Sequence, residues 1–151
     1  MKLVVDASMA LAWLFERTSK TEADCADQAL LCLAQAEVLV PALWHTEVAN
    51  ALLVGERRRV VTEAQVIDYL SKLSALPIAT DSAAPASRRD GIMALAREHR
   101  LTAYDATYLD LALRTGAILA TFDVALADAM RRAGGIVFGD AGQLRENPES
   151  K

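Results

Sequence analysis

Short apolar segments alternate along the chain with longer stretches in which apolar residues recur every three or four positions. The apolar segments predict five β-strands, over 3–5, 38–40, 76–79, 117–120 and 136–138. The stretches between them predict helices, including two in succession over 43–59 and 63–74. Strands that alternate with helices are typical of an α/β fold in which helices flank a mainly parallel sheet. We therefore expect one α/β domain with a parallel sheet of about five strands.

Local signals mark the ends of several helices. Thr62 and Gln65 have the spacing of a capping box, which begins a helix. Pro85 fits a first helical position, and Gly116 follows a helical stretch and fits a stop position. These signals give the helices boundaries that agree with the apolar pattern.

The length of 151 residues is enough for one core, so a single domain is expected. We assign residues 1–138 to this domain and 139–151 to a loosely held C-terminal tail. Asp6 interrupts the apolar N-terminal segment and argues against a signal peptide, and no uncharged run approaches the roughly 18 to 20 residues that span a bilayer. Cys25 and Cys32 are interpreted as core residues in a reducing compartment, so a cytoplasmic protein is expected.

The net charge of −4 argues at first against a nucleic-acid partner, because phosphate binding needs a basic surface. Twelve of the sixteen basic residues are arginine, however, and several are clustered at 57–59, 88–89 and 131–132. Solvated helix ends would explain any one of these clusters. Arginine is nevertheless the side chain suited to forked contacts with phosphate, so the excess mildly favours a phosphate-bearing partner.

Four acidic residues are placed at one edge of the predicted sheet. Asp6 ends the first strand, and Asp123 follows the fourth. Glu47 lies in the first turns of the helix that follows the second strand, and Asp105 opens the helix that leads into the fourth. Because functional groups in open parallel sheets gather outside the carboxyl ends of the strands, these four carboxylates are expected to converge.

Carboxylates at close quarters repel one another, so such a set is usually protonated or compensated by a cation. Hard oxygen ligands select Mg²⁺ or Mn²⁺, and the chemistry they serve best is displacement at phosphorus. Asp105 and Asp123 would also be explained as helix caps, and Glu47 as a solvated residue. Asp6 is harder to explain in this way, because an acid that closes a buried strand has a desolvation cost. The joint placement therefore predicts phosphodiester hydrolysis.

Other classes of protein also have an aspartate at the end of the first strand. A phosphatase of the haloacid-dehalogenase kind would use Asp6 as its nucleophile, but it needs a second Asp two residues later, where this chain has Ser8. It also needs a later lysine, and none lies between Lys72 and Lys151. The same lack of paired acids and a late lysine argues against a receiver domain. A metal-dependent phosphohydrolase for another phosphate ester and a non-catalytic binding module are the remaining alternatives.

Four segments of the chain resemble the PIN-domain family, especially the VapC-like ribonuclease toxins of bacterial toxin–antitoxin pairs. The segments are LVVDAS (3–8), HTEVANAL (45–52), TAYDATYLDLA (102–112) and ILATFDVAL (118–126). Each motif alone is weak, but the ordered set is specific and the resemblance spans about residues 3–138. It implies a parallel sheet between helices, a magnesium-dependent endoribonuclease, a homodimer and inhibition by a cognate antitoxin.

The resemblance also implies roles for individual residues. Asp6 and Asp105 would be the principal metal ligands, and Glu47 and Asp123 would complete the acidic pocket. Ser8, Asn50 and Thr121 match the family's polar support around that pocket. The family's second acid near the last motif has no clear counterpart here, because Asp128 lies five residues further along.

A contact with RNA can be expected further along the helix that contains Glu47. Arg58 lies eleven residues after Glu47 and returns close to the same helix face. The helical rise places it about 16 Å away, a distance of two or three nucleotides. We therefore expect Arg58 to bind RNA beside the acidic site.

Overall fold

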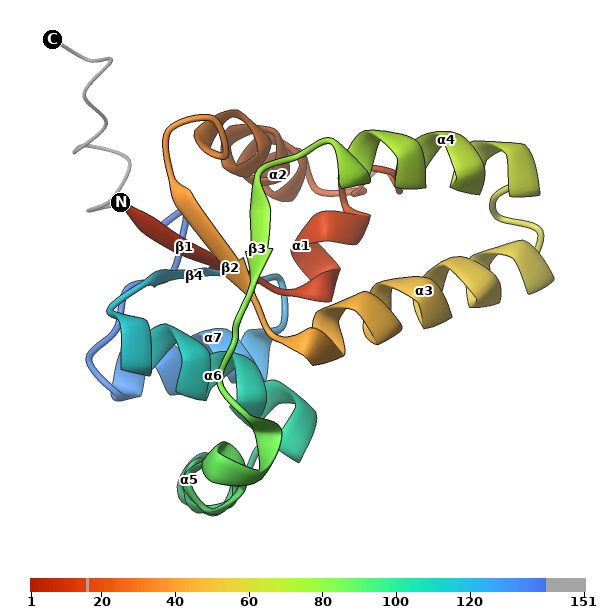
Figure 1. Cartoon of the computed structure of the whole chain (residues 1–151). Coiled ribbons are helices and arrows are strands. Elements are labelled where there is room, and N and C mark those ends of the chain that lie inside the picture. Colours follow the sequence, from red (N-terminus) through yellow and green to blue (C-terminus); the bar gives the residue numbers. More distant parts are fainter. Residues whose placement is uncertain (16, 141–151) are drawn as a thin grey trace, which may run out of the picture.

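The computed structural model describes residues 1–15 and 17–140 as an α/β domain. Most of the expected tail, 141–151, lies outside the described residues. Within the described residues, the elements follow one another in the order β1 (Lys2–Val5), α1 (Ala7–Leu11), α2 (Lys20–Cys32), β2 (Glu37–Val40), α3 (Ala42–Arg57), α4 (Glu63–Ser74), β3 (Ile78–Thr80), α5 (Pro85–His99), α6 (Ala103–Thr115), β4 (Ile118–Ala120) and α7 (Val124–Arg132). The expected α/β class is confirmed (Figure 1).

The four strands form one parallel sheet in the order β3-β2-β1-β4. β1 lies between two neighbours, and its residues Leu3, Val4 and Val5 are fully buried. A strand covered on both faces needs a continuous apolar run, which the first residues of the chain supply. Since all the strands are parallel, β1, β2 and β4 end at the same edge of the sheet.

The fifth expected strand, 136–138, is reduced to an isolated bridge between Val137 and Leu119 of β4. The Leu119 N–H donates to Ile136 O at 3.0 Å, and the Phe138 N–H donates to Leu119 O at 2.8 Å. Gly134 and Gly139, on either side of this segment, have φ angles of +86° and +94°. Glycine adopts positive φ angles at low energetic cost. The chain therefore turns away from the sheet both before and after this single bridge. The sheet therefore has four strands where about five were expected.

The third strand begins two residues later than expected, at Ile78. Pro77 precedes it and has no N–H to donate to a neighbouring strand. The helix boundaries agree more closely with the sequence signals. Thr62 and Gln65 form the expected capping box of α4, and Gly116 ends α6 with a φ angle of +67°.

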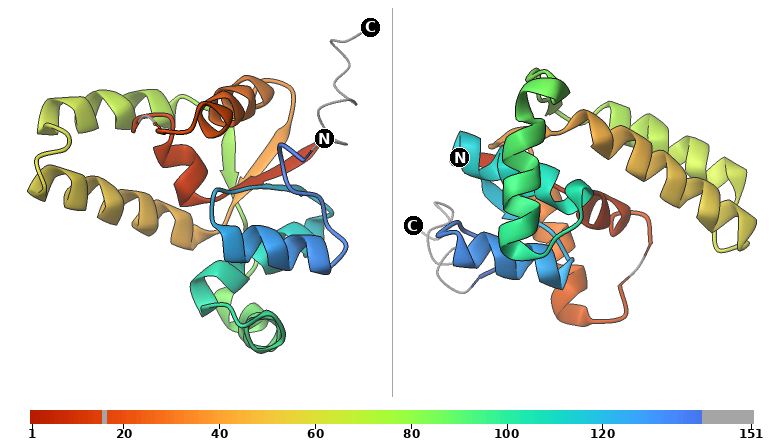
Figure 2. Two further views of the ribbon diagram at one scale, coloured as in Figure 1. Left: turned by 180° about the vertical axis from the view of Figure 1, so that it is seen from behind. Right: turned by 90° about the horizontal axis from the view of Figure 1, so that it is seen from below.

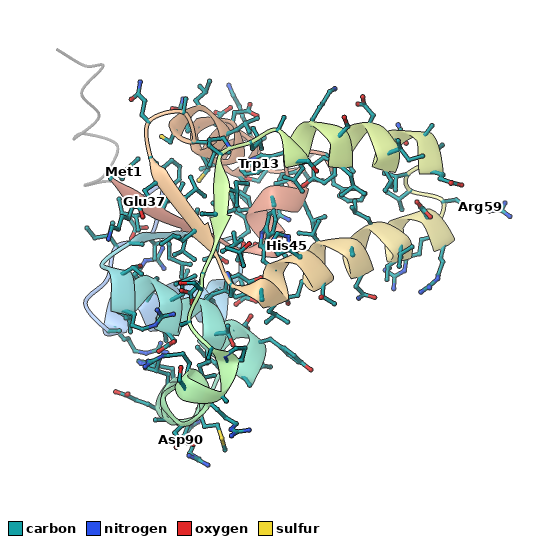
Figure 3. The ribbon with its side chains drawn as sticks, viewed as in Figure 1. Met1, Trp13, Glu37, His45, Arg59 and Asp90 are labelled. Carbon is teal, nitrogen blue, oxygen red and sulfur yellow. The ribbon has the colours of Figure 1, made fainter. Side chains whose placement is uncertain are left out.

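α3 and α4 form a hairpin that extends away from the sheet (Figures 1 and 2). The inner face of α3 is buried, and at Gly55 a Cβ atom would lie only 3.1 Å from Phe15 Cζ and from Val61 Cγ2. The Tyr69 hydroxyl of α4 donates a hydrogen bond to Ala10 O of α1 at 2.7 Å. The Tyr69 contact holds α4 against α1, and the Gly55 contact holds the end of α3 against Phe15, close to the tip of the hairpin where Arg59 lies (Figure 3).

α5 differs from the other long helices because it has no buried residue. It packs on α6, on the side away from the sheet (Figure 1). α6 in turn packs against β1, β4 and α7. Among the described residues, no helix is both long and apolar enough to cross a bilayer.

We expect Tyr69→Phe to lower the free energy of unfolding by about 1 kcal/mol, because it removes a buried hydrogen bond to Ala10 O. Tyr104→Phe is the matched control, since Tyr104 is exposed and should change stability by less than about 0.5 kcal/mol. Urea denaturation of the three proteins measures both values. Equal stability of the two variants would show that the Tyr69 hydroxyl does not hold the hairpin.

Candidate active site at the edge of the sheet

Asp6 lies at the carboxyl end of β1 and is also the N-cap of α1. Its Oδ1 accepts hydrogen bonds from the Met9 N–H at 2.9 Å and from the Ser8 hydroxyl at 2.7 Å. Its Oδ2 accepts a hydrogen bond from the Thr121 hydroxyl. The residue is only 5% exposed, so these three donors replace the water that a carboxylate normally binds.

The two hydroxyls also fix the turn between β4 and α7. Ser8 Oγ accepts from the Phe122 N–H at 2.9 Å, and Thr121 Oγ1 accepts from the Asp123 N–H at 2.9 Å. Each hydroxyl therefore donates to Asp6 and accepts from the backbone of that turn. Through these bridges the end of β1 determines where Asp123 begins α7.

Asp123 is the N-cap of α7, where its Oδ1 accepts from the Leu126 N–H at 2.8 Å. The helix-cap explanation raised from the sequence is thus correct for one of its carboxylate oxygens. Asp105 is different, because Thr102 caps α6 and accepts from the Asp105 N–H at 3.1 Å. The carboxylate of Asp105 is therefore not used as the cap of its helix.

Glu47 contacts a residue that the sequence analysis did not assign. The Tyr108 hydroxyl of α6 donates to Glu47 Oε1 of α3 at 2.5 Å. Burial and this hydrogen bond raise the pKa of Tyr108, so it remains a donor at neutral pH. Its position three residues after Asp105, on one side of the same helix, was the available signal. The contact links α6 to α3 and orients the carboxylate of Glu47 toward α6.

The four acidic residues affect one another electrostatically. Burial raises the pKa of Asp6 to about 6, and the charge of Asp123 adds to this effect, while the three hydrogen bonds oppose it. Burial also raises the pKa of Asp105, with further contributions from Asp123 and Glu47. Within the described residues, no lysine or arginine is among the groups that shift these two pKa values. The charge of Asp123 thus acts on both Asp6 and Asp105, and the charge of Glu47 acts on Asp105.

The donor set fits a hard divalent cation, because all four groups are carboxylates and oxygen ligands suit Mg²⁺ and Mn²⁺. In residues 1–15 and 17–140, no three His, Cys, Asp or Glu side chains are gathered closely enough to hold a metal ion. Asp6 and Asp105 are the carboxylates whose pKa values are raised, and a cation beside them would favour their charged forms.

Two other expected residues take no part in these contacts. Asn50 is exposed on α3, one turn after Glu47, and its side chain forms no hydrogen bond with the described part of the chain. Arg58 is the exposed C-cap of α3, at the far end of the hairpin from Glu47. Asp128 pairs with Arg131 at 3.0 Å on the exposed side of α7, which agrees with the expectation that it faces elsewhere.

A second charged network was not found from the sequence. Asp110 is 5% exposed and accepts from Arg88 Nε at 3.0 Å and from Arg114 Nε at 3.3 Å. Arg114 also donates to Asp81 Oδ2 at 2.7 Å. The spacing of Asp110 and Arg114, four residues apart on one helix, was the only local signal. This network attaches α5 and the segment after β3 to α6.

The fold and these motifs define a PIN domain, and the PIN domain family matches residues 3–131. The chain therefore belongs to this family. Among individual proteins, it is 36% identical to Ribonuclease VapC3 of Pyrobaculum aerophilum over 134 residues, which cover 85% of this chain and 94% of that protein.

Solved structures show the same fold. PAE2754 from Pyrobaculum aerophilum has a TM-score of 0.67 at 22% identity and covers 96% of this chain and 94% of its own. FitAcB from Neisseria gonorrhoeae has a TM-score of 0.60 at 19% identity, with 90% of this chain and 96% of its own covered. At these identities the likeness concerns the fold alone.

Without metal, the stability of the protein should fall as the pH rises from about 4 to about 6. The pKa of Asp6 is about 6 in the folded chain, and 3.8 is the ordinary value that applies to the unfolded chain, so between these values the folded chain holds a proton that the unfolded chain has released. Binding of more protons by the folded state means that its stability decreases with rising pH, here by about 3 kcal/mol. Asp6→Asn should remove this part of the pH dependence.

Urea denaturation in chelator at several pH values measures the effect. The pH dependence is the informative quantity, because loss of the acceptor for Thr121 would affect the variant at every pH. Asp24→Asn, on the exposed surface of α2, controls for the change in net charge. If Asp6→Asn keeps the wild-type pH dependence, the carboxylate is not the group that titrates in this range.

Proposed function

We propose that the protein is a metal-dependent endoribonuclease that hydrolyses phosphodiester bonds in RNA with Mg²⁺ or Mn²⁺. The observation that carries this proposal is the group of four carboxylates at one edge of the sheet, with burial and mutual charge raising the pKa values of Asp6 and Asp105. Membership of the PIN domain family and the likeness to a ribonuclease support it. Groups of this kind favour a divalent cation and a phosphate substrate.

Each residue has a proposed role. Asp6 and Asp105 are the principal metal ligands, and Glu47 and Asp123 complete the acidic pocket. When bound, the ion would polarise the phosphate and lower the pKa of an attacking water. Tyr108 orients Glu47 through its hydroxyl. The polar residues that support the pocket are Ser8, Asn50 and Thr121, and the contacts of Ser8 and Thr121 with Asp6 favour this role.

We further propose that the chain is the toxin of a toxin–antitoxin pair, acts in the cytoplasm as a homodimer and is inhibited by a cognate antitoxin protein. The support is its likeness to Ribonuclease VapC3 and the motifs that it shares with VapC-like toxins. Expression of the chain with and without its neighbouring reading frame would test the pairing through the growth of the host cells.

Cleavage of single-stranded RNA should require Mg²⁺ or Mn²⁺ and should stop in excess chelator. Asp105→Asn should lower the rate constant of cleavage about 100-fold or more, because it removes a proposed metal ligand worth several kcal/mol in the transition state. Asp128→Asn is the matched control, since Asp128 is an exposed acid paired with Arg131 on α7. Gel analysis of a labelled RNA under single-turnover conditions measures all three proteins.

Cleavage that continues undiminished in chelator, with contaminating nuclease excluded, would contradict the metal dependence. Equal losses in Asp105→Asn and Asp128→Asn would contradict the proposed location of the site, because only one of these acids lies in the cluster.

Arg58 is proposed to bind RNA that leaves the acidic site along α3. It is exposed and forms no ion pair in the described part of the chain, so its charge is available to a phosphate. Arg58→Ala should weaken RNA binding and reduce the slope of log affinity against log salt by about 1. The metal requirement should not change. Fluorescence anisotropy at several salt concentrations measures the slope, and an unchanged slope would leave Arg58 as a solvated helix end.

A further inference from the structure

A cavity of about 740 Å³ lies between the start of α3, the segment after β3, α5 and one face of α6. Its volume is in the range of small-molecule sites, about 300 to 1,000 Å³. Much of its wall is apolar, and its lining includes Leu43, Ile92, Met93, Tyr104, Arg89 and Arg114. None of the residues proposed as metal ligands lines it.

The charged residues of this cavity are not equivalent. The lining contains three arginines and two aspartates, so it has a net charge of +1 in a chain with a net charge of −4. Arg88 and Arg114 are held by Asp110 at 2.5 and 3.3 Å, and this network forms a neutralised part of the wall. Arg89 is exposed and forms no ion pair with any described residue. Its guanidinium is therefore available to an anionic ligand.

Tyr104 is the aromatic residue of the cavity wall, and it is 62% exposed. It directly precedes Asp105 in α6, while Leu43 lies one turn before Glu47 in α3. The first turns of α3 and α6 thus contribute residues both to the cavity wall and, within one turn, to the group of four acids. This end of the cavity therefore begins within one helical turn of Glu47 and Asp105.

We propose that this cavity binds a nucleotide of single-stranded RNA beside the phosphodiester bond that is cut. A base would stack on the ring of Tyr104, and Arg89 would bind a phosphate oxygen. Stacking on an aromatic ring and phosphate contact with arginine are the usual means by which proteins hold unpaired nucleotides. This inference rests on the proposed ribonuclease function. It adds to that function a site whose preference among nucleotides would influence where the RNA is cut.

The charge distribution favours RNA over the other plausible occupant, a second copy of this chain. A nucleotide carries a negative charge that can pair with the exposed Arg89, and it has a flat ring that can stack on the exposed Tyr104. A second copy would instead have to supply an acidic side chain and an apolar segment to the same wall. Sedimentation measurements distinguish these occupants.

The test uses Tyr104→Ala and Arg89→Gln, with two matched controls. Tyr104→Phe keeps the aromatic ring, and Arg97→Gln removes the same charge from an exposed position of α5 outside the cavity. The probe is a labelled single-stranded RNA of mixed sequence, and the same RNA annealed to its complement is a second probe. Binding is measured in chelator, where the RNA is not cut, and KM and kcat are measured with Mg²⁺.

Tyr104→Ala is expected to weaken binding of the single strand about 5- to 100-fold, the range for loss of one stacked base. Arg89→Gln is expected to weaken it about 5- to 10-fold. Both should raise KM more than they lower kcat, and Tyr104→Ala should also broaden the choice of cleavage position in a mixed pool of RNA. Arg97→Gln should behave as the wild type. Tyr104→Phe, which keeps the ring, should retain most of the binding that Tyr104→Ala loses, and the annealed RNA should bind more weakly than the single strand.

Three results would overturn the proposal. If the wild type cuts RNA and both cavity variants match Arg97→Gln, the cavity is not a nucleotide site although the ribonuclease function stands. If the variants lose activity together with a change of dimer to monomer, the cavity is an interface between copies. If the wild type neither binds nor cuts RNA, the proposed function fails and this inference fails with it.

Discussion

The buried carboxylate of Asp6 is the constraint on which the arrangement of the site depends. A carboxylate at the end of a central strand loses most of its water, and no described lysine or arginine compensates for that loss. Three hydrogen-bond donors replace the water, and two of them are hydroxyls whose oxygens are fixed by backbone N–H groups. The pKa of about 6 shows that this replacement is incomplete. The protein tolerates the negative charge of Asp6, and a bound cation would stabilise that charged form.

The register of the sheet brings these donors to Asp6. Val5 pairs with Ala120, and the Asp6 N–H donates to Ala120 O at 3.1 Å, so Asp6 and Thr121 leave their strands side by side. A shift of one residue between β1 and β4 would turn the side chains of that strand to the opposite face. The buried apolar residues that fix the register therefore also fix the position of the acidic site.

The sequence could predict where strands and helices end. It could not predict side-chain contacts that depend on how two of these elements pack together. Asp6 and Asp123 were placed correctly at one edge, because apolar runs and capping signals locate the ends of strands and helices. The contact of Tyr108 with Glu47 joins residues 61 positions apart. The apolar periodicity of a helix shows which of its faces is buried, but not how a second helix packs across it. The burial of Asp110 likewise could not be predicted from its helix, because a buried aspartate is expected only once its two arginine partners, Arg88 and Arg114, are known. The fifth strand was overestimated because an apolar segment does not show how long it stays paired.

The bridge from Asp6 to the turn before α7 has a consequence for synthesis of the chain. Asp6 is made 115 residues before its partner Thr121, and the last acid, Asp123, follows Thr121 by two residues. Early parts of the chain can form helices while they emerge from the ribosome, since folding can begin at the N-terminus. They cannot complete this group of acids. The assembled group of acids therefore appears only after Asp123 has been made and the end of β4 has packed beside β1.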